Sequence, residues 1–279
     1  ATIFRGKYLP QNKAAPVALV IGADPISSIT ATAGYRVGES EVNFAGGLSQ
    51  QPIELIKCET NDLLIPAHAE IIIEGEIAPD RIAPEGPFGE YTGYRSSAGS
   101  SHLLFRVKTI TYRHKPIVTM CVHGIPADEG HIGGAIGVAI ALKRRLQQEG
   151  LPVVDVFLPP EGASHLVVVS VSRGGNAIAK AVKEAITKRR AWYNKIIVVN
   201  DDIDIYNLSE VVHALSVKCH SYRGIFTYDE PGKGNPVSPC YSKDESTTAH
   251  GAVGLFDATW PLEWPEADIP VKSSFRTIY

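Results

Sequence analysis

The stretch Ala83-Pro84-Glu85-Gly86-Pro87-Phe88-Gly89-Glu90-Tyr91-Thr92-Gly93-Tyr94 decides how the rest of this chain is interpreted. Its two prolines fix φ, and its three glycines permit positive φ or close backbone approach, so we expect a rigid loop. A rigid loop can hold Glu85 and Glu90 in one geometry, as general acid–base chemistry requires. The alternative is a surface turn with two solvated glutamates, but this loop is more apolar and more constrained than such turns.

Further motifs follow one another along the chain. They are SEVNFAG at 40–46, KCETNDLLIPA at 57–67, AEIIIEG at 69–75, LPPEG at 158–162 and NDDID at 200–204. Together with the loop at 83–94, which is similar to the signature APEGP[FY]G[ED]xxGY, they resemble the UbiD family of reversible decarboxylases. That family includes polyprenyl-hydroxybenzoate and ferulic or cinnamic acid decarboxylases. The resemblance covers essentially the whole chain, in the family's order.

The composition is that of an ordinary globular protein. The chain has 279 residues, of which 44% are hydrophobic and 20% are charged, and its formal charge is -3. This charge gives no electrostatic reason to expect binding to nucleic acid or to an anionic membrane surface. We find no apolar run of the roughly 18 residues that span a bilayer, and no signal-peptide layout at the start. The four widely spaced cysteines suit a reducing compartment, so we expect a cytoplasmic protein.

The pattern of elements changes along the chain, which predicts a mixed α+β and α/β fold. Short β-branched segments at 14–22, 53–58, 70–74, 103–111 and 117–123 predict strands, and the resemblance implies a split β-barrel of flavin-reductase type over 1–125. A helix at 135–148 lies within a linker at 126–150. From 151 to 279 we expect an α/β oligomerisation domain and a tail. Its predicted strands are 153–157, 165–171, 196–199 and 224–228, and its predicted helices are 176–190 and 208–218.

The resemblance implies an enzyme whose chemistry depends on prenylated FMN. In the family, the glutamate that corresponds to Glu90 donates a proton after CO₂ has left. The glutamate that corresponds to Glu85 belongs to the same Glu-Arg-Glu network and positions the arginine and the acid. We therefore expect a reversible, non-oxidative decarboxylase of an aromatic, heteroaromatic or α,β-unsaturated acid.

The resemblance also implies which residues bind the cofactor. Thr32 and Ala33 lie in a small-residue segment that the family places against the flavin phosphate, and Lys188 aligns with a lysine that reaches this phosphate. Glu41 aligns with a ligand of Mn²⁺ or Mg²⁺, and K⁺ is expected as a further cation. Each assignment has an alternative from the residues alone: a closely packed helix, an exposed acidic pair formed with Glu39, and a solvated basic run at 188–190.

Two residues are candidates for the substrate pocket, namely Tyr91 and His131. A lone loop histidine is also often a hydrogen-bonded structural residue, and that alternative stays open for His131. Asp201, Asp202 and Asp204 follow a predicted strand and could suggest a metal site. The family has no metal there, so we interpret them as turn and helix-start acids.

Part of the family pattern is missing from this chain. The family's arginine, and the asparagine and histidine that complete its metal site, precede the strand at 16–21, where this chain has about fifteen residues. Arg5 and Arg36 match no family position. We therefore expect the C-terminal part of a UbiD protein. It would act as a homodimer or higher homo-oligomer, or together with a second chain that supplies the missing part. The alternatives are a non-catalytic UbiD-like scaffold subunit and an ordinary FMN-dependent oxidoreductase.

Overall fold

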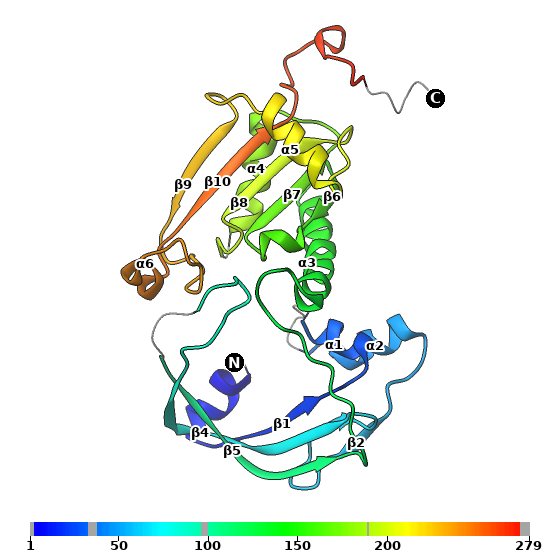
Figure 1. Cartoon of the computed structure of the whole chain (residues 1–279), viewed down its shortest axis with the longest axis vertical. Helices are drawn as coiled ribbons and strands as arrows, with labels where there is room; N and C mark the ends of the chain where they lie inside the picture. The colour runs from blue at the N-terminus through cyan, green and yellow to red at the C-terminus, as the bar shows by residue number, and fades with distance from the viewer. Residues whose placement is uncertain (1–2, 33–37, 96–99, 189, 274–279) are drawn as a thin grey trace. The chain divides into compact units, whose positions relative to one another are not determined.

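The computed structural model of this protein describes residues 3–32, 38–95, 100–188 and 190–273 (Figure 1). The chain forms two compact units. The first comprises Ala1–Phe88 and Arg95–Val122, and the second comprises Gly89–Tyr94 and His123–Tyr279. No helix in the described ranges combines the length and the apolarity that crossing a membrane requires.

The first unit is built on an antiparallel sheet with the strand order β1-β4-β5. A two-stranded ribbon of β2 and β3 covers a small core, in which Cys58 is buried beside Ile65 and Ile72. Burial raises the pKa of the Cys58 thiol. The elements are β1 (Ala15–Ile21), α1 (Pro25–Thr32), α2 (Glu41–Ser49), β2 (Leu55–Lys57), β3 (Leu64–Pro66), β4 (Ile71–Glu85) and β5 (Ser100–Tyr112), after short helical turns at Phe4–Tyr8 and Leu9–Gln11.

The mixed α and β character of the chain is confirmed, but the first unit differs in detail from the predicted split barrel. Within the described residues its strands form an open sheet and a separate ribbon, and they do not close into a barrel. The sheet has β1 and β5 as its outer strands, and three strands are too few for closure, since even small partly open barrels use about five.

Three local predictions in this half of the chain are corrected. The segment 117–123 is irregular, and one reason is that the backbone N–H of Ile117 donates to the Glu70 carboxylate instead of to a neighbouring strand. Strand β4 continues far beyond residue 74, because a register shift between Ile77 and Ile82 lets it stay paired with β5 past its prolines. Helix α3 (Glu129–Gln148) begins six residues earlier than predicted, at an N-cap formed by Asp128.

Glu74 and Gly75, which end the motif at 69–75, have a structural role in the first unit. The buried carboxylate of Glu74 accepts hydrogen bonds from the backbone N–H groups of Glu59 at 2.9 Å and Thr60 at 2.8 Å, and from the Thr60 hydroxyl at 2.6 Å. Burial tends to raise the pKa of Glu74, but these hydrogen bonds outweigh it and the pKa is lowered. These hydrogen bonds therefore connect the motif at 57–67 to the motif at 69–75.

Replacing Gly75 by Ala is expected to destabilise the first unit by about 1–3 kcal/mol or more, as overpacking does. A Cβ at Gly75 would lie 2.0 Å from the backbone oxygen of Arg106 and 2.7 Å from Cε2 of Phe105, so strand β5 would have to move. Denaturant unfolding measures the loss. Gly47→Ala is the matched control, because a Cβ on that helical glycine meets no atom within 4 Å. Equal stability of Gly75→Ala and Gly47→Ala would contradict the argument.

The second unit contains a mixed five-stranded sheet with the order β6-β7-β8-β10-β9. Strands β7, β8 and β10 are parallel, while the outer strands β6 and β9 run antiparallel to their neighbours (Figure 1). The elements are β6 (Val153–Phe157), β7 (Leu166–Val171), α4 (Asn176–Thr187), β8 (Lys195–Asn200), α5 (Leu208–Val217), β9 (Ile225–Glu230), α6 (Lys243–Thr248) and β10 (Gly251–Ala258). The predicted α/β alternation of this half is confirmed, and β10 is an additional strand.

Helices cover both faces of this sheet. Val167 and Val169 point into a core shared with α3 and α4, whereas Val168 between them points into a second core shared with α5. This alternation follows from the two-residue period of a strand. It gives three layers, with α4 and α5 on opposite faces (Figure 1). Helix α3 contributes Leu142 and Leu146 to the first of these cores, so it is an integral part of the second unit.

Candidate functional site

The two glutamates of the motif at 83–94 belong to different units. Glu85 ends strand β4, and its exposed carboxylate lies 3.1 Å from Nε2 of His102 in the first unit. Glu90 is half-buried in the second unit, within a tight turn in which its N–H donates to Tyr94 O at 2.9 Å. Gly93 closes this turn with a φ of +80°, which favours glycine. The prediction of a continuous loop is therefore wrong for 83–85, which are strand residues.

Tyr91, next to Glu90, is held at both ends by buried residues of the second unit. Nε2 of His131 lies 2.7 Å from the Tyr91 carbonyl oxygen, and Nδ2 of Asn235 donates to the Tyr91 hydroxyl at 2.6 Å. His131 and Asn235 are 6% and 4% exposed. Because a carbonyl oxygen can only accept, this contact assigns a hydrogen to Nε2 of His131. Burial raises the pKa of Tyr91, and the hydrogen bond from Asn235 opposes that rise. These contacts fix the position of the turn that carries Glu90.

His165 is a further titratable neighbour of Tyr91, with the ring centroids 6.2 Å apart. Its Nδ1 lies 2.7 Å from the carbonyl oxygen of Ala163, and its buried Nε2 has no hydrogen-bond partner among the described residues. Burial lowers the pKa of His165, so the neutral ring is favoured. No motif surrounds His165, so the sequence alone does not mark it.

Replacing Tyr91 by Phe is expected to destabilise the second unit by about 1–3 kcal/mol, because it leaves the buried amide of Asn235 without its acceptor. Tyr94→Phe, which removes a hydroxyl from a side chain that is 60% exposed, is expected to change little. Thermal unfolding of Tyr91→Phe, Asn235→Ala and the double variant measures the coupling. Strictly additive effects of the two substitutions would show that this hydrogen bond contributes nothing.

His131 is also part of a capping box at the start of α3. The Asp128 side chain accepts from the backbone N–H of His131 at 3.0 Å, and Nδ1 of His131 accepts from the backbone N–H of Asp128 at 3.3 Å. This Nδ1 also lies 2.7 Å from Oδ1 of Asp128. The exposed ring of His123 approaches the other carboxylate oxygen, with Nδ1 at 3.3 Å from Oδ2. Burial tends to raise the pKa of Asp128, but the hydrogen bonds from His131 outweigh it and the pKa is lowered. The D-x-x-H spacing was a signal for this cap that sequence analysis did not use.

The residues assigned to the cofactor lie in both units. Thr32 ends α1 and Glu41 begins α2, and these two helices pack against each other in the first unit. Lys188 directly follows α4 in the second unit and is exposed, as Glu41 is. Ala33 lies outside the described residues. The structure therefore brings Glu90, Tyr91 and His131 together within the second unit. Three other described candidates, Thr32, Glu41 and Glu85, belong to the first unit.

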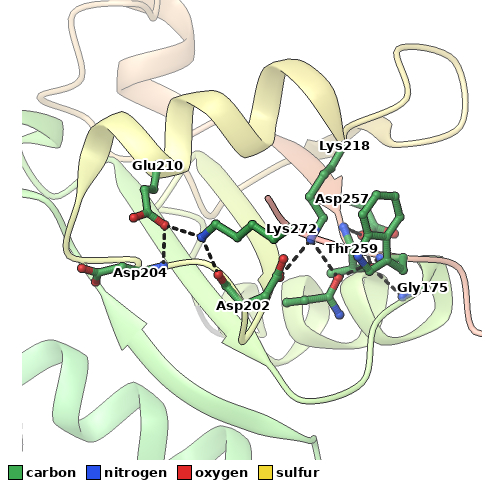
Figure 2. A network of polar contacts seen from close by, with 10 residues as sticks. Gly175, Asp202, Asp204, Glu210, Lys218, Asp257, Thr259 and Lys272 are labelled. Atoms are coloured by element: carbon green, nitrogen blue, oxygen red, sulfur yellow. Dashed lines mark hydrogen bonds and ion pairs between the residues drawn. The ribbon is translucent and has the colours of Figure 1, made fainter. Parts of the chain in front are cut away.

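Asp202 and Asp204 belong to a polar network within the second unit (Figure 2). Asp202 Oδ1 pairs with Lys218 at 3.0 Å, and its backbone oxygen accepts from Lys272, which also reaches Glu210 at 2.8 Å. The Asp204 carboxylate accepts from the backbone of Tyr206. Within the described ranges, none of these acids is part of a cluster of three or more potential metal ligands. The contacts agree with their interpretation as turn and helix-start acids.

Comparisons with protein families cover both halves of the chain. Residues 2–126 match the family model of the 3-octaprenyl-4-hydroxybenzoate carboxy-lyase Rift-related domain, UbiD. Residues 131–255 match the C-terminal domain of the same carboxy-lyase, UbiD_C. The two models match in order, and the first also covers Gly89–Tyr94 and residues 123–126, which belong to the second unit.

Individual relatives agree with this result. The chain is 30% identical to a pyrrole-2-carboxylic acid decarboxylase of Pseudomonas aeruginosa over 99% of its own length and 58% of that protein. It is similar to the UbiD-class enzyme HmfF from Pelotomaculum thermopropionicum in complex with FMN, with a TM-score of 0.84, 30% identity, and coverage of 98% and 59% of the two chains. An evolved dimeric form of that enzyme with prFMN gives a TM-score of 0.76 and 29% identity over 96% and 57%. The chain thus spans somewhat more than half the length of these relatives.

Proposed function

This chain belongs to the UbiD family, and from that premise we propose that it forms the larger part of a reversible, non-oxidative decarboxylase. The proposed substrate is an aromatic, heteroaromatic or α,β-unsaturated carboxylic acid, and the proposed cofactor is prenylated FMN. One observation carries the proposal: both domains of a single carboxy-lyase family match this chain in order. The motif that contains Glu85 and Glu90 lies within the matched span.

The residues of this chain fit the proposed cofactor chemically. The hard carboxylate of Glu41, exposed in the first turn of α2, suits Mn²⁺ or Mg²⁺. The exposed ammonium group of Lys188 suits a phosphate, and Thr32 with Ala33 would offer small side chains that admit a phosphate closely. We propose K⁺ as a further cation. The family's arginine, asparagine and histidine would come from the part of the relatives that this chain does not span, in the same polypeptide or in a partner.

Decarboxylation replaces a carboxylate by hydrogen, so one proton is consumed for every CO₂ that leaves. When bound, prenylated FMN supplies the acceptor for the electron pair that CO₂ leaves behind. Glu90 is assigned to donate the proton to the carbon atom that has lost CO₂, and to remove it in the reverse direction. Glu85 is assigned to position this donor. The contacts of Tyr91 with His131 and Asn235 support the assignment, because they restrict the turn that carries Glu90.

The substrate pocket is proposed to include Tyr91. His131 contributes to it through Tyr91, since one ring nitrogen of His131 faces the Tyr91 carbonyl and the other faces Asp128. A planar ring would suit an aromatic wall of this kind. This leaves aryl, heteroaryl and cinnamic-type acids as the compounds to compare.

The experiment that tests the function starts from protein purified from cells that make prenylated FMN, together with any polypeptide that co-purifies. Mass analysis identifies the released flavin and the intact chains, and CO₂ release is measured with pyrrole-2-carboxylate, vanillate and cinnamate. Prenylated FMN with turnover of at least one acid is expected. Unmodified FMN with oxidoreductase activity would favour the flavin oxidoreductase, and no flavin with no turnover would favour the scaffold. Native mass of the same sample separates a homo-oligomer from a complex with a second chain.

A further inference from the structure

We propose that His123, Asp128 and His131 form a binding site for a divalent transition-metal ion of the Zn²⁺ type. This site lies within the second unit, and it is distinct from the metal position assigned to Glu41 in the first unit. It requires nothing from the flavin chemistry. It is therefore tested without reference to the proposed function.

The donor atoms of these three residues lie close together. One ligand atom from each of the three residues lies within 4.8 Å of the other two. The closest approaches are 2.7 Å between His131 Nδ1 and Asp128 Oδ1, and 3.3 Å between His123 Nδ1 and Asp128 Oδ2. Donors of a tetrahedral zinc site are roughly 3.4 Å apart, as zinc–ligand bonds of about 2.0–2.1 Å require. The exposed His123 ring is the ligand with most freedom to rotate toward that geometry.

One carboxylate oxygen of Asp128 has no hydrogen bond within the described part of the chain. Asp128 is 8% exposed at its side chain, and its Oδ1 is engaged by the backbone and ring of His131. Its buried Oδ2 accepts no hydrogen bond from any residue that the structure describes, and it faces His123. A buried carboxylate oxygen in this state is costly, and a cation between it and the two imidazoles would satisfy it.

The orientation of His131 also suits a metal ligand. Metal-binding histidines usually donate their other ring N–H to a carboxylate or a backbone carbonyl, which fixes the tautomer. Here Nε2 lies 2.7 Å from the carbonyl oxygen of Tyr91, and this leaves the lone pair of Nδ1 on the side of Asp128. In the metal-free structure this lone pair accepts from the backbone N–H of Asp128 at 3.3 Å, and a bound ion would take its place.

Gly130 supplies the space that the site needs. A Cβ there would lie 2.7 Å from Cε1 of His123 and 3.2 Å from Oδ1 of Asp128, so the His123 ring packs against the bare backbone of the first turn of α3. A larger residue at this position would push the ring away from the carboxylate. The absence of a side chain at Gly130 therefore has a direct geometric role in the cluster.

The donor set selects the class of ion. Two imidazoles and one carboxylate suit Zn²⁺, Co²⁺, Ni²⁺ or Fe²⁺, whereas Mg²⁺ and Ca²⁺ prefer sites made only of oxygen ligands. Three protein ligands leave a position for water, which the exposure of His123 allows. A bound ion would also tie the segment 123–131 to the turn at 89–94 through the contact between His131 and Tyr91. Both segments belong to the second unit.

The experiment uses the complete protein after chelator treatment and titrates it with Co²⁺ and Zn²⁺ alone. We expect one ion per chain, a tetrahedral Co²⁺ absorption spectrum that Zn²⁺ displaces, and a higher unfolding temperature with Zn²⁺. His123→Asn is expected to weaken binding at least tenfold and to fold normally, because its side chain is half exposed. Gly130→Ala is expected to weaken binding while it keeps all three ligands.

Two matched variants control for other sites. His114→Asn removes an exposed histidine outside the cluster, and Glu41→Gln removes the ligand assigned to the flavin-associated metal; both are expected to bind Co²⁺ and Zn²⁺ as the parent does. Equal affinity of His123→Asn and the parent would overturn the proposal, as would the absence of binding in the parent. The contacts of Asp128 would then be those of an ion-paired helix cap only. Neither result bears on decarboxylation, which is measured separately.

Discussion

Replacing Glu90 by Gln is expected to slow CO₂ release about 10²- to 10⁴-fold, the usual contribution of a general acid. Glutamine has nearly the same size and keeps the backbone turn with Tyr94, but its amide cannot deliver the proton that the product requires. Bound flavin and the unfolding temperature should stay close to those of the parent. The rate is measured as CO₂ release, and incorporation of deuterium from D₂O into the product reports on the proton step itself.

The control is Glu149→Gln, which removes an exposed carboxylate at the end of helix α3 and is expected to leave the rate unchanged. Glu85→Gln is expected to lower the rate as well, but through the position of the donor, so partial activity should return with Glu85→Asp. A Glu90→Gln enzyme that retains a rate within tenfold of the parent would remove Glu90 from the role of proton donor. The family assignment would be unaffected.

Replacing Lys183 by Met is expected to cost the second unit about 3 kcal/mol, or roughly 6–12 °C in unfolding temperature. Lys183 and Glu230 are both 7% exposed and form an ion pair between helix α4 and strand β9, with the lysine ammonium 4.0 Å above the ring of Tyr228. Methionine fills the space but leaves Glu230 with Lys233 alone, at 2.7 Å. That remaining partner keeps the loss at the lower end of the range of about 3–5 kcal/mol for broken buried pairs.

This loss is expected to depend on pH. Burial tends to raise the pKa of Glu230, but the hydrogen bonds from Lys183 and Lys233 outweigh it, so the pKa is lowered in the folded protein. A carboxyl group with a lowered folded-state pKa stabilises the fold above its unfolded value, and this stabilisation disappears as the pH falls through the folded value. The difference between the parent and Lys183→Met should therefore persist at pH 7 and shrink below about pH 4.5.

Two further variants make the prediction specific. Lys180→Met removes an exposed lysine from the same helix and is expected to cost no more than about 1 kcal/mol, the scale of its cation–π contact with Phe226. A Lys183→Met/Glu230→Leu double variant should recover most of the stability, since it removes both buried charges. Denaturant unfolding compares all three. Lys183→Met within 1 kcal/mol of the parent at pH 7 would contradict the importance of the pair.

The local patterns in this chain predict its second half well. Strand β7 and helix α5 lie close to their predicted ranges, because a strand alternates its faces every two residues and a helix repeats every 3.6. The same reasoning failed at 117–123, where exposed apolar residues resemble a strand but the segment is irregular and the backbone N–H of Ile117 donates to Glu70. The predicted strand at 70–74 is much shorter than β4, which ends at Glu85. Prolines near the end of β4 are typical of a turn, and only the pairing with β5 shows that the strand continues.

The candidate site was predictable as a set of residues, and its arrangement was not. The motif at 83–94 named Glu85, Glu90 and Tyr91, but nothing local shows that Glu85 ends a strand while Glu90 lies in a turn of the other unit. Glu74 and Gly75 belong to a motif of the family, but the sequence does not show what these two residues do. In the structure, Glu74 is a buried carboxylate that accepts hydrogen bonds, and Gly75 allows close contact with β5.

The sequence by itself determined the family, the α/β half of the fold and the acids proposed for catalysis, because these depend on local periodicity and short motifs. Only the tertiary structure decided which side chains meet. Tyr91 and Asn235 are 144 positions apart, and His131 reaches Tyr91 across 40. The physical reason is that hydrogen bonds and ion pairs act over a few ångströms in space, whatever the separation along the chain. No spacing rule therefore marks such partners until the chain has folded.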